Sequence, residues 1–252
     1  APLELLDVPA HLDGSRGMYR ATGPNYLGAK DDYDAIRLWL ASFLNAGKHR
    51  TFDAYRREIE RFYMWCLLEN NVPLSGVSLA HGIAYQGFLK AIPERFISKA
   101  RVTREDPRWR PWRGQLNEAS QAYALAIVSQ CFTALWKNGY LTGNPLTSLK
   151  SVYTKTRVMD TSRALSTADL LWLRESLNDL PGLESKDPTR AALARRTRLI
   201  LHLLLTTGMR RDEVASGRFS RLEKAVVRGV EQSDEWLLPV IGKGKKERKV
   251  PL

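Results

Sequence analysis

One stretch near the end of the sequence constrains the fold most. An aliphatic run stops at Thr-Thr-Gly, residues 206–208, and is followed by Arg210 and Arg211. Such a run is able to pack as a buried helix, and glycine ends helices because it takes left-handed backbone angles without steric penalty. We therefore expect Arg210 to emerge from the end of an apolar helix, where a rigid guanidinium suits a phosphate. An ordinary surface arginine after a helix is the alternative that this stretch leaves open.

The charge of the chain indicates its partners. The 252 residues carry a formal net charge of +12, which favours attraction to a polyanion. Nucleic acid is the first candidate and an anionic membrane surface the second. No apolar stretch reaches the length of about 18 residues that a spanning helix needs, and the mixed polar start is not that of a signal peptide. We expect a cytoplasmic, nucleoid-associated protein.

Cysteine and histidine usage gives no sign of a metal site. Cys66 and Cys131 each lie in a helical pattern among aromatic and aliphatic residues, which predicts reduced core thiols. The four histidines are scattered and show no metal-ligand spacing. No cofactor is expected.

Hydrophobic periodicity divides the first half of the chain into an arm and a helical bundle. Residues 1–29 have no clear period and are expected to pack on the bundle or to trail from it. Residues 30–149 are predicted to form four helices, because apolar residues recur at three- and four-residue intervals. The expected helices run from the acidic pair at 31–32 to Gly47, from Thr51 as N-cap, from about Ser78 to Ala91, and from Asn117 or Glu118 to Gly139.

Basic residues outside the apolar faces are candidates for DNA contact. Several lie at the start of the second helix, and others lie in residues 94–114, where arginines alternate with tryptophans and prolines. Such a loop suits a sugar–phosphate backbone, although tryptophans that merely anchor a surface loop are an equal alternative. A solvated basic face is the plain account of the helix arginines. The candidates are Lys48, Arg50, Thr51, Arg56, Arg57, Arg108, Arg110 and Arg113.

A second domain is expected after a basic linker at residues 150–163, which holds Lys155 and Arg157. Residues 164–252 are predicted to contain helices over 165–180 and 190–207 and strands over 226–230 and 236–241. Glycines then flank Lys243 between two extended runs, which indicates a hairpin with this lysine at its tip. A merely charged turn is the alternative.

Two motifs in this second domain resemble those of the tyrosine recombinases, the phage integrase family of site-specific DNA strand-exchange enzymes. Thr-Thr-Gly-Met-Arg-Arg-Asp-Glu-Val at 206–214 is similar to the family's first catalytic box. Val-Ile-Gly-Lys-Gly-Lys-Lys-Glu-Arg-Lys-Val-Pro-Leu at 240–252 is similar to its lysine hairpin. Residues 51–62, together with 144–149 and 163–166, resemble parts of the SAM-like DNA-clamping domain and the domain junction.

The resemblance implies roles for particular residues. Arg210 would bind the non-bridging oxygens of the scissile phosphate, Lys243 would donate a proton to the departing 5′ oxygen, and Glu213 would orient the site. Further DNA contacts would come from Arg211, Lys245 and Arg248. The expected fold is mainly α with a small antiparallel β-sheet: a four-helix DNA-binding bundle followed by part of an α+β catalytic domain.

The sequence departs from the family pattern after the hairpin. No tyrosine follows Arg210, and the last one is Tyr153, so the family's covalent 3′-phosphotyrosine chemistry has no nucleophile among these residues. We interpret the chain as the first part of a recombinase or integrase of a mobile element. The complete protein would break and rejoin double-stranded DNA as a tetramer on paired sites, without a membrane or a small-molecule cofactor. The alternatives are a naturally truncated DNA-binding protein that occupies such sites or regulates transcription, and a generic RNA- or membrane-associated helical protein.

Overall fold

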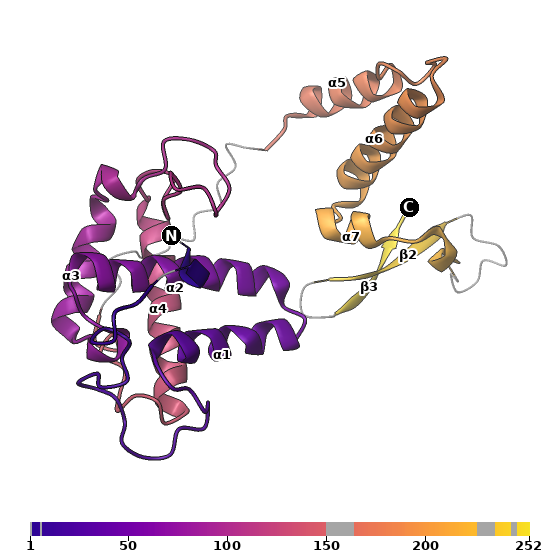
Figure 1. The fold of residues 1–252 in the computed structure, drawn as a ribbon. Helices are drawn as coiled ribbons and strands as arrows, with labels where there is room; N and C mark the ends of the chain where they lie inside the picture. Colours follow the sequence, from indigo (N-terminus) through magenta and orange to yellow (C-terminus); the bar gives the residue numbers. More distant parts are fainter. Residues whose placement is uncertain (1, 6, 150–163, 226–234, 243–245) are drawn as a thin grey trace. The chain divides into compact units, whose positions relative to one another are not determined.

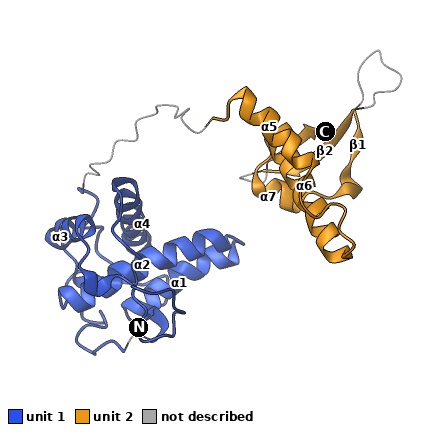
Figure 2. Ribbon diagram, turned by 90° about the horizontal axis from the view of Figure 1, so that it is seen from above, with its two compact units in different colours: residues 1–157 blue, residues 158–252 orange. Residues whose placement is uncertain are grey.

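The computed structural model describes residues 2–5, 7–149, 164–225, 235–242 and 246–252. The chain divides into two compact units, residues 1–157 and 158–252 (Figure 2). Helices predominate in the described residues, and their sheet is three-stranded and antiparallel, which confirms the predicted fold class. None of the described helices is both long enough and apolar enough to cross a bilayer.

Four α-helices build unit 1, as the periodicity predicts (Figure 1). They are α1 (Asp32–Asn45), α2 (His49–Glu69), α3 (Leu79–Lys90) and α4 (Glu118–Lys137). Short 3₁₀ turns at Leu3–Leu5, Leu74–Gly76 and Glu94–Phe96 join or precede them. Side-chain caps set two of the starts, because the carboxylate of Asp31 accepts the amide of Asp34 and the side chain of Asn117 accepts that of Ser120.

The prediction of Thr51 as the N-cap of α2 is wrong. The helix begins at His49, with Lys48 as the N-cap residue, and Thr51 lies in its first turn. Gly47 has a φ of +67°, and the amide of Lys48 donates to the carbonyl of Phe43 at 2.8 Å. The chain reverses within this short turn at Gly47. The helix α2 therefore starts before Thr51, although Thr51 has the better capping side chain.

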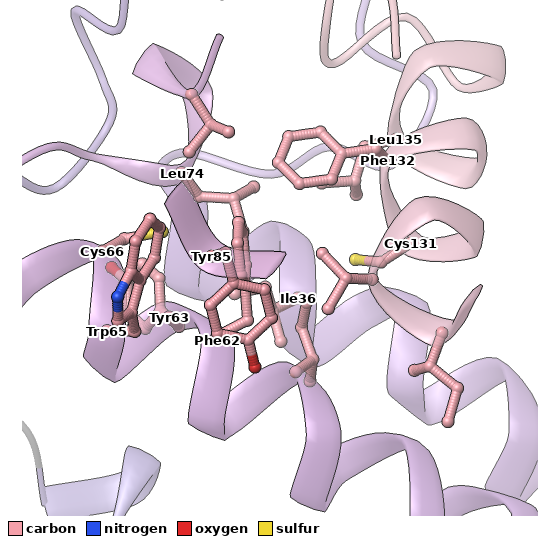
Figure 3. Packing of buried hydrophobic residues seen from close by; sticks show 14 of the residues in the cluster. Ile36, Phe62, Tyr63, Trp65, Cys66, Leu74, Tyr85, Cys131, Phe132 and Leu135 are labelled. Atoms are coloured by element: carbon pink, nitrogen blue, oxygen red, sulfur yellow. The ribbon is translucent and has the colours of Figure 1, made fainter. Parts of the chain in front are cut away.

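Aromatic rings from α2, α3 and α4 meet in the core of unit 1 (Figure 3). Phe62 is fully buried and packs edge-to-face on Tyr85 at 4.8 Å and on Phe132 at 5.8 Å between ring centroids. Cys66 and Cys131 are both free and completely buried, which confirms the prediction of core thiols. Burial raises the pKa of both thiols.

The N-terminal arm packs on the bundle, with Leu3 and Leu12 in its core. The hydroxyl of Ser75 donates to the carbonyl of Gly14 in the arm at 3.0 Å, and the amide of Asp32 donates to the carbonyl of Asp13 at 2.8 Å. Asp32 is fully buried and accepts hydrogen bonds from the amide of Ser75 at 2.9 Å and the hydroxyl of Tyr140 at 2.7 Å. A Cβ at Gly14 would lie 2.0 Å from the Asp32 carboxylate, so this crossing needs a glycine. Burial outweighs these hydrogen bonds and raises the pKa of Asp32 to about 6.

The long loop between α3 and α4 is anchored by Trp112. This side chain is fully buried and packs against Phe88 and Phe96 at 5.4 and 5.7 Å between centroids. Arg104 of the same loop turns inward, where its guanidinium binds the buried Glu60 at 2.7 Å and Glu4 of the arm at 2.9 Å. Trp112 and Arg104 therefore hold the loop onto unit 1, as the anchoring alternative expects.

Unit 2 joins three helices to the small sheet. Its elements are α5 (Thr167–Asn178), α6 (Pro188–Thr207), α7 (Arg211–Ser216), a 3₁₀ turn (Phe219–Arg221), β1 (Glu223–Lys224), β2 (Trp236–Ile241) and β3 (Glu247–Pro251). Strand order is β1-β2-β3, and Leu238 pairs with Val250. The predicted strand at 226–230 lies outside the described residues. Met209 packs into the core of the sheet with Leu238, Val240 and Val250.

Candidate functional site

The backbone around Arg210 is fixed on both sides. Gly208 ends α6 in the left-handed conformation, at a φ of +60°, as the sequence predicts. Met209 is buried against the sheet, and Arg210 is the N-cap residue of α7 in an extended conformation. The side chain of Arg210 is nevertheless 66% exposed. A rigid backbone thus presents a guanidinium to solvent.

Glu213 orients the side chain of Arg210. Its carboxylate is 1% exposed and accepts the amide of Arg210 at 2.8 Å and the Nη1 of Arg210 at 2.9 Å. Arg248 of β3 donates to the same carboxylate through Nη2 at 2.7 Å. The Arg210 amide, followed by the guanidinium of Arg248, lowers the pKa of Glu213 to about 2. The carboxylate therefore stays ionised, and two guanidinium groups surround it.

The base of the predicted lysine hairpin lies against this cluster. The amide of Gly242 donates to the carbonyl of Lys246 at 2.8 Å, which joins the end of β2 to the start of β3. A Cβ at Gly242 would lie 3.1 Å from Oε1 of Glu213 and 3.7 Å from Nη1 of Arg210. Two motifs that are far apart in the sequence thus meet in space. Lys243 and Lys245 themselves lie outside the described residues.

The structure describes all eight unit 1 candidates for DNA contact. Lys48, Arg50 and Arg113 are exposed, and Thr51 is partly buried in the first turn of α2. Arg56 pairs with Glu4, Arg57 with Glu58 and Arg108 with Asp106, while Arg110 donates to the carbonyls of Pro107 and Trp109. All of them belong to unit 1, whereas Arg210 belongs to unit 2. Lys155 and Arg157 of the linker lie outside the described residues.

Arg248 has a different environment from that expected of a plain DNA contact. It is paired with Glu213, while its side chain is still 46% exposed. Sequence reasoning missed this pairing because the partners are 35 residues apart and no local periodicity links them. Arg211, in contrast, is 85% exposed beside Asp212, as expected of a surface arginine next to Arg210.

The arrangement favours binding of an oxyanion. Only one terminal nitrogen of Arg210 is committed to the side chain of Glu213, so the guanidinium keeps N–H donors for a ligand. One carboxylate between two guanidinium groups leaves the cluster positive. The described residues contain no group of three or more histidine, cysteine, aspartate or glutamate side chains placed to hold a metal ion.

Comparison with known proteins gives structural matches alone. No protein-family model matches the sequence, and no curated protein matches it. Two solved structures of the XerH site-specific recombinase are similar: a post-cleavage complex with a palindromic difH substrate and a pre-cleavage complex with difH. In each case the identity is 17%, the TM-score is 0.49, and the match covers 89% of this chain. It spans 54% of the XerH chain, or about half its length.

Proposed function

We propose that this chain is the DNA-binding unit and the first part of the catalytic unit of a tyrosine recombinase. The observation that carries the proposal is the contact between the base of the lysine hairpin and the Arg210–Glu213 pair. Gly242 approaches both side chains, and Arg248 of the following strand binds Glu213 at 2.7 Å. Attack on a phosphodiester needs a fixed guanidinium to meet the charge that develops on the phosphate, and Lys243 follows Gly242 directly in the sequence.

In the proposed reaction Arg210 binds the non-bridging oxygens of the scissile phosphate, where negative charge builds up during attack. Glu213 keeps the guanidinium oriented, and Arg248 in turn keeps Glu213 in place. Lys243 acts as general acid toward the leaving 5′ oxygen. A tyrosine from a segment outside the 252 residues supplies the nucleophile, as the resemblance to the family implies. The full-length protein would act as a tetramer on paired sites of double-stranded DNA.

The test separates cleavage from binding in the full-length protein. Arg210→Ala is expected to lower the rate of strand cleavage on a nicked suicide substrate by about 100-fold or more, the effect of losing one oxyanion donor. DNA affinity in a mobility-shift assay should change by less than about threefold, because the other cationic side chains still bind the phosphates. Arg196→Ala, at an exposed position on α6, is the matched control and should leave both quantities unchanged.

Two results would contradict the proposal. Equal losses of binding and cleavage in Arg210→Ala would refute the division of labour. A reading frame that ends after Leu252 would favour the alternative of a DNA-binding protein without cleavage activity. For the chain itself, the proposal requires DNA binding whose affinity falls steeply with salt.

A further inference from the structure

A basic hollow lies in the loop between α3 and α4 of unit 1. Its volume is about 570 Å³, and it is lined by the cationic side chains of Arg95, Lys99, Arg108 and Arg110 together with Glu94. We call this feature the loop hollow. It lies in unit 1, apart in the sequence from the Arg210 cluster.

The base of the loop is rigid. The amide of Ser98 donates to the carbonyl of Trp112 at 2.7 Å, and the amide of Trp112 donates to the carbonyl of Phe96 at 3.2 Å. Arg61 of α2 binds the carbonyl of Pro111 at 2.9 Å, and Trp112 is fully buried. Both walls of the loop hollow therefore start from fixed backbone, so binding there costs little ordering of the chain.

Carboxylates outside the lining orient two of the cations. Arg95 donates through Nη2 to both oxygens of Glu69, at 2.7 and 2.6 Å, which leaves Nε and Nη1 for a ligand. Arg108 binds Asp106 through Nε at 3.0 Å and Nη2 at 2.8 Å, which leaves Nη1. These pairs hold the guanidinium groups without using all their donors.

The remaining two cations are the ones most available to an anion. Lys99 lies 3.4 Å from Glu94, but both side chains are more than 80% exposed, and water screens such a pair strongly. Arg110 donates to two carbonyls of its own loop and has no carboxylate partner among the described residues. An incoming phosphate can therefore displace Glu94 from Lys99 and bind Arg110, whose charge no carboxylate of the described residues neutralises.

We propose that the loop hollow binds the phosphodiester backbone of a nucleic acid, as a contact separate from the Arg210 cluster. The proposal rests on the proposed function, since it assigns a further part of the same DNA-binding surface. A polymer fits better than an enclosed small molecule, because the lining side chains of Arg95, Lys99 and Arg108 are 66%, 82% and 74% exposed. The net charge of +12 attracts the same ligand.

The first test measures the salt dependence of duplex binding by fluorescence anisotropy with the 252-residue chain. The double variant Lys99→Ala/Arg110→Ala should reduce the slope of log K against log salt by about 2, because each cation that no longer meets a phosphate lowers the slope by close to one. Lys90→Ala/Lys137→Ala removes the same charge from exposed positions in the last turns of α3 and α4 and should leave the slope unchanged. Equal slopes for the two double variants would overturn the proposal.

The second test does not depend on the strength of the loop's own hydrogen bonds. Ala100 lines the hollow, and both native cysteines are buried, so Ala100→Cys gives one accessible thiol. Saturating duplex should slow its reaction with a maleimide at least about tenfold, while Ala84→Cys on the exposed surface of α3 should react at an unchanged rate. Unchanged labelling of Ala100→Cys would overturn the proposal.

The outcomes also separate this site from the proposed function. If the chain binds duplex while the loop variants behave like their controls, the loop-hollow proposal is wrong and the proposed DNA-binding function stands. If the chain binds no duplex, both proposals are wrong. Protection of Ala100→Cys by inorganic phosphate or a nucleoside triphosphate, with none by duplex at equal ionic strength, would show a small-anion site and overturn the assignment to a nucleic-acid backbone.

Discussion

Asp32 gives unit 1 a stability that depends on pH. Its pKa rises from an ordinary 3.8 to about 6, because burial outweighs the hydrogen bonds from Ser75 and Tyr140. Between these pH values the folded state keeps a proton that the unfolded state has released. The stabilisation is therefore complete below about pH 4 and is lost as the pH rises through 6. At about 1.4 kcal/mol per pKa unit, the difference is worth about 3 kcal/mol.

The substitution Asp32→Asn removes the titrating group and keeps the size of the side chain. The side-chain NH2 of the asparagine is a donor that would face the hydroxyl of Tyr140 or the amide of Ser75, which are donors too. We therefore expect Asp32→Asn to destabilise the protein at every pH. The gap in unfolding free energy between wild type and Asp32→Asn should nevertheless shrink by about 2.4 kcal/mol from pH 4 to pH 7. All other titrating groups are shared and cancel in this difference.

Urea denaturation followed by tryptophan fluorescence measures this gap. Trp65 and Trp112 are buried in unit 1, whereas Trp172 and Trp236 of unit 2 are 67% and 42% exposed. The change in signal therefore reports mainly on unit 1. A gap that stays constant within about 0.5 kcal/mol over this pH range, near the error expected for such differences, would refute the reasoning about Asp32.

Three further substitutions test the site and the loop. Glu213→Gln should lower strand cleavage by the full-length protein with little change in DNA affinity, because Arg210 and Arg248 lose their shared carboxylate. Since the pKa of Glu213 is about 2, the wild-type cleavage rate should show no titration of this group from pH 5 to 9. A titration of Glu213 in that range would contradict its assignment. Gly242→Ala brings a methyl group to 3.1 Å from Oε1 of Glu213 and should also slow cleavage. The control Gly87→Ala, where nothing lies within 4 Å of the added methyl group, should not slow it. Equal cleavage rates for the two variants would argue against the close approach of Gly242 to Glu213. Trp112→Ala should cost about 3–5 kcal/mol of unfolding free energy in urea, as for other buried aromatic residues, and a loss below about 1 kcal/mol would show that this side chain does not anchor the loop.

The helices could be predicted because their signals are local. The recurrence of apolar residues located α1 to α4, and Gly208 located the end of α6. Thr51 misled the prediction, since a good capping residue cannot reveal that the preceding turn closes early at Gly47. The role of the tryptophans in the loop also stayed open. Composition alone does not distinguish a ring that packs edge-to-face on Phe88 and Phe96 from one that faces a ligand.

The candidate site could be predicted in part, for the same reason. Arg210 and Glu213 are three residues apart on one turn, so their proximity follows from the sequence. The contact of Arg248 and Gly242 with Glu213 does not, because it requires β3 and the base of the hairpin to pack beside α7. The same holds for Arg104, whose inward turn onto Glu60 spans 44 residues.

The sequence by itself determined where Arg210 leaves its helix, because glycine, the aliphatic run and the acidic residue three positions later act over a few residues. Only the tertiary structure decided which donor pairs with which carboxylate. Arg248 binds Glu213, Arg104 binds Glu60 and Tyr140 binds Asp32 across long stretches of chain. Periodicity gives the face on which a side chain lies. The partner across that face is set by the packing of whole elements, where burial makes each carboxylate depend on a donor from a distant part of the chain.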